Sequence, residues 1–419
     1  MNRSNPPINQ PVDVAIIGGG PAGLAAAMEL KRRGVEHVVV LERETRAGGI
    51  PRHCGHPPFG MREFRQILTG PRYARKLVQA ASTAGVDIRT STTVIEARKN
   101  AELLITTDKG LQTLLARRVI HATGVRETPR SARLISGMRP SGVLNTGALQ
   151  SMVYLKAMRP FENPVIIGSE LVAFSAIKTC RHGKIRPVAM IENARQPTAR
   201  WPVPLYARIS GIALHLGTRL VGIEGKDRVS SVVLEEQDGE QRRMVCDGVL
   251  LTGKFTPESS LARCGHLAID PATGGPVVDT LGRCSDPAYF AAGNVLRPVE
   301  TAGWSWNEGR NTGRRVADDL AGRLASSQAN IPVTFSGPLI KFVMPQEIAL
   351  PVSQAGMQNL QLRFHARAKG ILKAISGNKV IWRKAMSVYP ERRVLIPVAP
   401  LAGRCADGQI ELRFESPVS

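Results

Sequence analysis

The chain has 419 residues, 43% of them apolar and 21% charged, which is enough for two or three globular domains with sizeable cores. Its net charge of +22 is scattered along the whole length, and with only 5% aromatic residues this argues against a nucleic-acid-binding tract. The charge instead favours an acidic protein partner or an anionic ligand. No stretch is apolar for long enough to span a membrane, and the polar start of the chain does not resemble a signal peptide, so we expect a cytoplasmic protein.

The first predicted unit is a strand, a glycine-rich turn, a helix and a second strand. The turn is GGGPAG at residues 18–23, and the second strand ends at Glu42. In a dinucleotide-binding turn, Gly18 would permit the tight bend, Gly20 would let the backbone approach a pyrophosphate, and Gly23 would allow close helix–strand packing. Glu42 is placed to accept hydrogen bonds from an adenosine ribose. These features in this order predict a dinucleotide site, and the alternative is a tightly packed turn that binds nothing.

The next hundred or so residues predict a helix followed by short strands. Their periodicity and β-branched content predict a helix at 73–84, a strand pair at 86–89 and 92–97, a hairpin of 103–107 with 112–116, and a buried strand at 118–124. The last strand ends in the small residues Ala122, Thr123 and Gly124. Such a turn suits close passage of the backbone past a bound ligand.

A second unit imitates the first, because Glu192 follows Gly168 at the same distance along the chain as Glu42 follows Gly18. In this copy Glu170 stands at the position of the middle glycine. Its side chain and charge would oppose an approaching pyrophosphate. The favoured interpretation is a Rossmann scaffold retained without its nucleotide, and binding of NAD(P) is the alternative that the sequence leaves open.

The rest of the chain predicts a meander, a return to the first unit and a separate small domain. The predicted elements are strands at 219–223, 229–235, 243–245 and 248–253, a strand running into Gly293 and Asn294, and a helix from about Trp306 to Leu324. After residue 331 the composition shifts to short β-like runs with proline and basic residues. The predicted organisation is therefore a first nucleotide-binding part, a degenerate second Rossmann domain, a return segment and a β-rich C-terminal domain, at 12–130, 140–250, 251–326 and 331–419.

Three segments resemble the FAD-contacting segments of the glutathione reductase-like superfamily of flavoproteins with two dinucleotide-binding domains. They are GGGPAG with Glu42, Ala122-Thr123-Gly124 and Ala292-Gly293-Asn294, and the resemblance covers residues 12 to about 325. It implies an α/β fold with two Rossmann-like domains, one for FAD and one NAD(P)-like, and it implies FAD as the cofactor. The resemblance leads us to expect that FAD is bound by Gly18, Gly20, Pro21, Ala22, Gly23, Glu42, Arg43, Gly49, Ile50, Val94, Ala122, Thr123, Gly124, Gly293, Asn294, Thr301 and Ala302.

Other motifs narrow the resemblance. The segments at 48–56, 168–174 and 299–304 are similar to the FAD subunits of heteromeric amino-acid, opine and cyanide-forming glycine dehydrogenases. The segment at 59–74 is also similar to stand-alone flavoproteins that accompany glycerol-3-phosphate dehydrogenase-like proteins. The first likeness implies a small-molecule substrate and two kinds of partner: a second flavoprotein and a small iron–sulfur protein.

The sequence departs from the resembled families at its cysteines and at Asn294. Disulfide reductases carry a cysteine pair in the loop where this chain has only Cys54, and opine-type subunits often carry a cysteine-rich C-terminal segment where it has only Cys405. Disulfide reduction and a cluster of its own are therefore not expected. Asn294 stands where the superfamily usually has aspartate, and its amide can still donate and accept hydrogen bonds.

Cys54 lies among the basic residues Arg52, His53 and His56, which could lower the pKa of its thiol. A structural or flavin-neighbouring role is favoured over a nucleophilic one, and zinc ligation by this group is the least favoured interpretation. The sequence assigns no general base, because a lone histidine is more often structural than catalytic. Candidates by residue type are His53, His56, His121 and His182.

The leading hypothesis is an FAD-dependent oxidoreductase that works as one subunit of a heteromeric dehydrogenase. Its motivation is an intact FAD turn beside a damaged nicotinamide turn. Two alternatives remain: a stand-alone NAD(P)H-dependent flavin oxidoreductase, and a non-catalytic FAD-binding scaffold that docks a partner.

Overall fold

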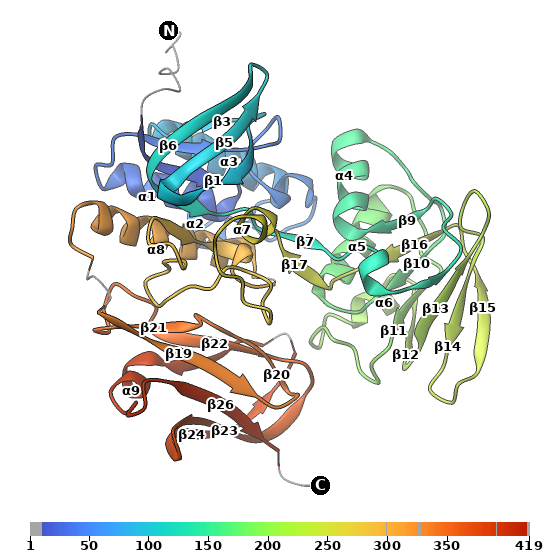
Figure 1. Cartoon of the computed structure of the whole chain (residues 1–419). Helices are drawn as coiled ribbons and strands as arrows, with labels where there is room; N and C mark the ends of the chain where they lie inside the picture. Colours follow the sequence, from blue (N-terminus) through green and yellow to red (C-terminus); the bar gives the residue numbers. More distant parts are fainter. Residues whose placement is uncertain (1–10, 299, 325–327, 391, 417–419) are drawn as a thin grey trace.

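The computed structural model describes residues 11–298, 300–324, 328–390 and 392–416 (Figure 1). Its first sheet has the strand order β3-β2-β1-β6-β5-β4, with β18 pairing to β6. β1 is parallel to both β2 and β6, as in a Rossmann unit. The strands of this sheet are β1 (Val12–Ile17), β2 (Val38–Leu41), β3 (Asp87–Arg89), β4 (Thr93–Ala97), β5 (Glu102–Thr107), β6 (Gly110–His121) and β18 (Tyr289–Ala291).

Two strand predictions for this sheet were wrong, one in its bounds and one in its pairing, whereas the predicted hairpin of 103–107 with 112–116 is confirmed. The predicted strands at 112–116 and 118–124 are one long strand, β6, because its first half closes a hairpin with β5 while its second half lies parallel to β1. The predicted pair at 86–89 and 92–97 does not form. β3 joins β2 and β4 joins β5, so the two strands lie at opposite edges of the sheet.

Helices α1 (Pro21–Arg32) and α8 (Ala302–Leu320) pack against each other beside this sheet (Figure 1). Their backbones approach closely at glycines of α8: a Cβ on Gly309 would lie 2.0 Å from the Ala22 carbonyl oxygen. The helix begins one turn before the predicted start at Trp306. Its earlier start places the first turn of α8 near the glycine turn. The remaining helices of this part are α2 (Met61–Phe64), α3 (Gly70–Thr83) and α7 (Ser260–Cys264).

The second α/β part repeats the Rossmann pattern. Its five-stranded sheet is parallel throughout, in the order β12-β11-β10-β16-β9, and it is flanked by the antiparallel meander β13-β14-β15. The short antiparallel pair β7 (Val125–Glu127) and β17 (Phe255–Pro257) links it to the first part (Figure 1). The other elements are β8 (Ser136–Gly137), β9 (Val143–Asn145), α4 (Thr146–Lys156), β10 (Pro164–Ile167), α5 (Leu171–His182), β11 (Ala189–Glu192), α6 (Leu205–Ile209), β12 (Ala213–Leu216), β13 (Arg219–Glu224), β14 (Ser231–Glu235), β15 (Gln241–Val245) and β16 (Gly248–Leu251).

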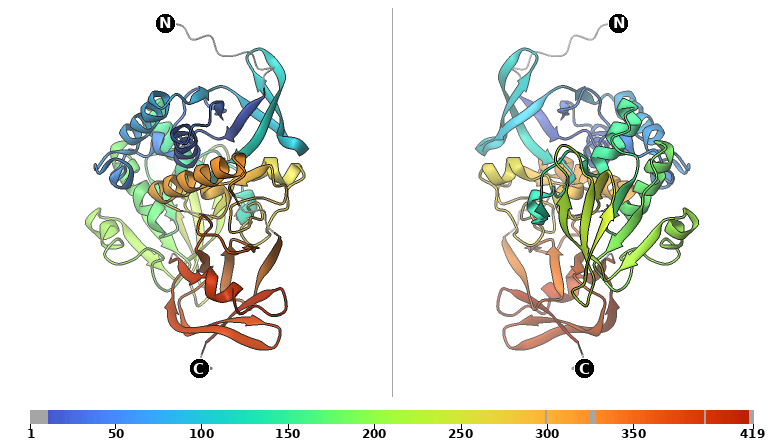
Figure 2. Two further views of the ribbon diagram at one scale, coloured as in Figure 1. Left: turned by 90° about the vertical axis from the view of Figure 1, so that its left-hand side faces the viewer. Right: turned by 90° about the vertical axis from the view of Figure 1, so that its right-hand side faces the viewer.

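The C-terminal part is almost entirely β-structure with a core of its own, and it forms the red lobe in Figure 2. One sheet has the order β21-β19-β26-β23-β24 and the other β20-β22-β25. These elements are β19 (Ala329–Ser336), β20 (Ile340–Met344), β21 (Glu347–Leu350), β22 (Asn359–Phe364), β23 (Ala368–Ser376), β24 (Lys379–Val388), β25 (Val394–Pro397), α9 (Val398–Ala402) and β26 (Ile410–Glu415). The predicted fold class is confirmed, and the domain boundaries stay predictions. Among the described helices, none combines the length and apolar character needed to cross a membrane.

Candidate functional site

A cavity of about 1480 Å³ lies between the glycine turn, the start of α8 and the second α/β part. Every predicted FAD-binding residue lines it except Gly23 and Gly293. These two glycines pack behind the lining: a Cβ on Gly23 would lie 2.0 Å from the Gly18 carbonyl oxygen, and one on Gly293 would lie 2.7 Å from the Ala22 Cβ. The sequence therefore predicted the residues that the fold brings together, while their contact with FAD stays a prediction.

The first glycine turn is shaped as an open cradle. Gly18 has φ +110°, and a Cβ there would lie 2.5 Å from the Ala122 carbonyl oxygen. Gly20, by contrast, faces free space, because a Cβ on it would meet only the Gly49 Cα, at 3.9 Å. The N-terminus of α1 starts directly after Gly20 and has no side-chain cap. Its backbone N–H groups are thus available for an anion, which fits the pyrophosphate of a dinucleotide.

Glu42 is held at the edge of this cradle by backbone donors. Its carboxylate accepts hydrogen bonds from the Gly19 N–H at 3.0 Å and the Glu44 N–H at 2.9 Å. The side chain is buried and lines the cavity. Its position at the end of β2 fits the ribose-binding acid of a Rossmann unit.

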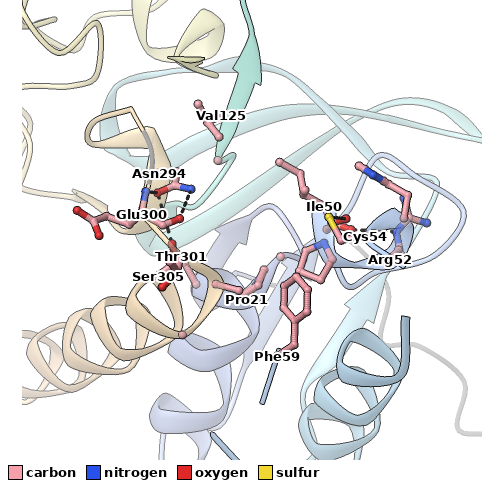
Figure 3. A pocket seen from close by; sticks show the side chains of 18 of the residues that line it. Pro21, Ile50, Arg52, Cys54, Phe59, Val125, Asn294, Glu300, Thr301 and Ser305 are labelled. Atoms are coloured by element: carbon pink, nitrogen blue, oxygen red, sulfur yellow. Dashed lines mark hydrogen bonds between the residues drawn. The ribbon is translucent and has the colours of Figure 1, made fainter. Parts of the chain in front are cut away.

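Asn294 ties the return strand to the start of α8 (Figure 3). Its side-chain nitrogen donates to the Glu300 carbonyl oxygen at 3.1 Å, and its side-chain oxygen accepts from the Glu300 N–H at 2.8 Å. Both ends of the amide thus fix the residue that precedes Thr301. The Asn294 side chain also lines the cavity.

The second glycine turn has the same backbone as the first but is filled by its own side chains. Gly168 has φ +120°, and a Cβ there would lie 2.7 Å from the Glu170 Oε2. A Cβ on Gly253 would lie 2.6 Å from the Glu170 Cδ. Arg133 closes the same region by donating to the Thr252 and Gly253 carbonyl oxygens at 2.8 and 2.7 Å. The residues of this turn do not fit a dinucleotide pyrophosphate.

Glu192, the counterpart of Glu42, is likewise engaged within the protein. It accepts hydrogen bonds from the Ser169 hydroxyl and from the Ala194 N–H, the latter at 2.9 Å. The Ser169 hydroxyl in turn accepts from the Thr198 N–H at 2.9 Å. Of the described residues that line the cavity, none belongs to Gly168–Ser169–Glu170 or to Glu192.

The environment of Cys54 corrects the expectation that basic neighbours lower its pKa. Burial, followed by the negative charge of Glu127, raises the pKa of Cys54 to about 12. Its thiol donates to the Gln150 Oε1 at 3.4 Å, and the His53 Nδ1 lies 3.4 Å from the same oxygen. Cys54 is therefore a protonated thiol in the cavity wall (Figure 3).

The candidate histidines separate into two groups. His53 and His56 line the cavity, and burial lowers the pKa of each, so both are neutral near pH 7. His121 is buried in the sheet behind the turn, where burial and then His266 lower its pKa to about 4. His182 stacks on Tyr154 and is not among the described residues lining the cavity.

Sequence reasoning missed the cavity wall that the second α/β part supplies. Leu171, Phe174, Ser175 and Lys178 of α5 line it, together with Tyr206 of α6. The four α5 positions recur at helical spacing and so share one face, which is the signal that could have identified them.

Comparison with protein families matches residues 12–309 to the family described as pyridine nucleotide-disulphide oxidoreductase. This family binds FAD and, in its second domain, NAD(P). All six cysteines of this chain are described, and all are free thiols, with no pair beside the cavity.

Two curated relatives and one solved structure show how far the similarity reaches. Hydrogen cyanide synthase subunit HcnB of Pseudomonas protegens is 29% identical over 52% of this chain and 50% of that protein. An opine oxidase subunit of Agrobacterium tumefaciens is 23% identical over 96% of this chain and 77% of that protein. Thioredoxin reductase of T. acidophilum superposes with a TM-score of 0.61 at 22% identity, covering 74% of this chain and 98% of that one. The chain spans about half the length of the cyanide synthase relatives.

Proposed function

Because the chain belongs to the pyridine nucleotide-disulphide oxidoreductase family, we propose that this FAD-dependent oxidoreductase is one subunit of a heteromeric dehydrogenase. The complex would oxidise an amino acid, an opine or a similar small substrate and pass the electrons to a partner protein. A heteromeric setting is supported by the names of three relatives, which are subunits of cyanide synthase and opine oxidase and the small chain of glutamate synthase.

The observation that carries the proposal is the contrast between the two nucleotide turns. Gly20 faces the cavity, whereas Glu170 fills the corresponding place in the second unit. A flavin held at the first turn would then lack a nicotinamide nucleotide at the second. Its electrons are expected to come from a substrate or a partner protein.

Each group of cavity residues has a proposed task. The N–H groups that follow Pro21 in the first turn of α1 bind the pyrophosphate, and Glu42 binds the adenosine ribose. The N–H groups at Thr301 and Ala302 open the N-terminus of α8, which favours negative charge at the flavin's pyrimidine edge. FAD, when bound, would supply the redox chemistry, because a flavin can take two electrons from a substrate and pass them to an acceptor. Because the Cys54 thiol is protonated, it does not act as a nucleophile in the wall of the cavity.

The test is anaerobic reduction of the purified chain, alone and co-expressed with the products of adjacent genes. We expect a yellow protein whose flavin absorbance is unchanged by millimolar NADH or NADPH. The co-expressed complex should be bleached by one class in a screen of amino acids and opines. Rapid bleaching of the isolated chain by a nicotinamide nucleotide would favour the stand-alone reductase. A flavin that no tested substrate reduces in the complex would favour the scaffold, and a colourless protein that cannot be reconstituted with FAD would reject all three hypotheses.

A further inference from the structure

Glu300 is a buried carboxylate between the proposed flavin site and the C-terminal β-structure. The residue is 9% exposed and lines the cavity beside Thr301 and Ala302 (Figure 3). A buried carboxylate requires hydrogen bonds or cationic partners, because removing its charge from water is costly. The partners of Glu300 therefore identify what fixes this end of the cavity.

Two of these partners come from the C-terminal part. The Arg363 Nη2, on β22, donates to the Glu300 Oε1 at 2.6 Å. The Arg393 Nε, directly before β25, lies 3.7 Å from the same oxygen. The arginine side chains are 11% and 21% exposed, so solvent screens these contacts less than it screens surface pairs.

The remaining contacts connect Glu300 to the return strand. The Arg297 Nε lies 3.9 Å from the Glu300 Oε1, and its Nη1 donates to the Glu308 Oε2 at 3.1 Å. That Glu308 oxygen also accepts from the Gly293 N–H at 3.0 Å. A continuous network thus runs from the C-terminal part through Glu300 to the predicted flavin segment at Gly293.

Trp304, in the first turn of α8, forms a second connection. The guanidinium carbon of Arg393 lies 3.7 Å from the centroid of its ring, and that of Arg62 lies 4.1 Å away. Both are within the range of cation–π attraction. Arg393 therefore contacts both Glu300 and Trp304, which flank the N-terminal residues of α8.

We propose that the C-terminal β-structure is part of the flavin site, in which Arg363 and Arg393 position the turn at residues 300–304. This inference rests on the proposed function, because it requires FAD at the cavity. The two guanidiniums hold the first N–H groups of α8 in place and supply positive charge beside them. Loss of the positioning or of the positive charge destabilises negative charge on the reduced flavin. The C-terminal residues thereby acquire a task that the sequence did not assign.

The test compares Arg393→Gln with Arg392→Gln in the full chain. Arg392 is exposed and stacks on Tyr389, with its guanidinium carbon 4.5 Å from the ring centroid, so its variant carries the same charge change without the contacts to Glu300. We expect Arg393→Gln to lower the reduced-to-oxidised flavin ratio about tenfold at a fixed potential, a fall of about 30 mV for a two-electron couple. Arg392→Gln should match the wild type. Equal potentials in all three proteins, or equal shifts in both variants, would overturn the proposal.

A second measurement reads the contact without a flavin. In apo-protein, Arg393→Gln should change the fluorescence of Trp304, isolated by difference against Trp304→Phe, and Arg392→Gln should not. Unchanged fluorescence would also overturn the proposal. If the wild type cannot bind FAD, the proposed function fails at that step, and the fluorescence result still decides whether Arg393 holds the turn. Arg363→Gln is less suitable, because it removes the short ion pair of a buried carboxylate and is expected to destabilise the fold itself.

Discussion

The two nucleotide turns share one backbone and differ in what their side chains leave open. The strand, the left-handed glycine and the twelve-residue helix recur, with Gly18 at φ +110° and Gly168 at φ +120°. The residue before the helix is extended in both, with φ −83° at Gly20 and −75° at Glu170. A common backbone therefore does not establish a common ligand. The side chain at the middle position decides whether the helix N-terminus is accessible to a phosphate.

Gly20→Glu is the strongest test of this contrast, because it places the residue of the second turn in the first turn. A Cβ at Gly20 has ordinary contact distances, so the variant should fold. Its carboxylate would occupy the cradle and repel a pyrophosphate. We expect FAD affinity to fall roughly a thousandfold, about 4 kcal/mol, measured by titration of apo-protein with FAD.

Gly20→Ala is the matched control. It adds the Cβ without the charge, so its loss of FAD affinity should be about tenfold, which would come from keeping the pyrophosphate off the backbone. Undiminished FAD binding by Gly20→Glu would place the cofactor elsewhere in the cavity and remove the contrast between the turns.

The strands behind the two turns differ in one titratable residue. In the first unit His121 pairs with Ile17, and in the second unit Leu251 stands at the corresponding position and pairs with Ile167. Burial and then His266 lower the pKa of His121 from 6.5 to about 4, and its side chain is 1% exposed. The folded state thus keeps His121 neutral while the unfolded chain takes up a proton below pH 6.5. The contribution of neutral His121 to the free energy of unfolding is fully present above pH 6.5. It falls by about 3 kcal/mol as the pH drops to about 4.

His121→Leu copies the second unit and should flatten the acid side of a plot of unfolding free energy against pH. The buried Nε2 of His121 has no hydrogen-bond partner among the described residues, so the leucine should cost little at pH 7. Denaturant unfolding between pH 4 and 7 makes the measurement, with His37→Leu, a substitution of an exposed histidine, as the control. An unchanged slope in His121→Leu would show that other groups cause the acid sensitivity.

The sequence predicted the parts of the site that depend on local rules. Gly18, Gly20 and Glu42 belong to one short unit whose spacing is set by a strand, a turn and a helix, and they meet as expected. Glu170 follows the same local rule, because its side chain lies against Gly168 and Gly253 at the position of the middle glycine. Local spacing was sufficient in each of these cases.

What the sequence could not predict depends on contacts between distant segments. Arg363 and Arg393 reach Glu300 only because the C-terminal sheets pack beside α8, and no local pattern records that packing. The first turn of α8 was missed for a related reason, since its Trp304 contacts Arg62 and Arg393, which lie far from it in the sequence. Burial also reversed the expected pKa shift of Cys54, although its sequence neighbours are basic.

The opposite substitution, Glu170→Gly, would sharpen the comparison from the second turn. It removes the side chain that packs against Gly168 and Gly253 and leaves the Arg133 guanidinium near the opened helix N-terminus. A cation there favours phosphate, so we expect at least tenfold tighter binding of NADPH than in the wild type, measured by calorimetry.

Glu170→Gln separates shape from charge at the same position. It keeps the side chain in the turn, so it should bind NADPH no better than the wild type if filling the turn is what matters. A gain as large as that of Glu170→Gly would mean that charge alone excludes the nucleotide. Tight NADPH binding by the wild type would contradict the closed second turn.

The two acids that follow the turns allow the finest comparison. Glu42 accepts from backbone N–H groups and lines the cavity, whereas Glu192 is bound by the Ser169 hydroxyl and lies outside that lining. Glu42→Gln replaces one acceptor oxygen by a donor that faces an N–H group, and it removes the charge offered to a ribose hydroxyl. Hydrogen bonds to charged groups contribute about 1.5–3 kcal/mol, so FAD affinity should fall about tenfold or somewhat more. Glu192→Gln makes the same chemical change in the second unit and should leave FAD affinity unaltered; equal losses in both variants would mean that the acid acts through the fold rather than through the ribose.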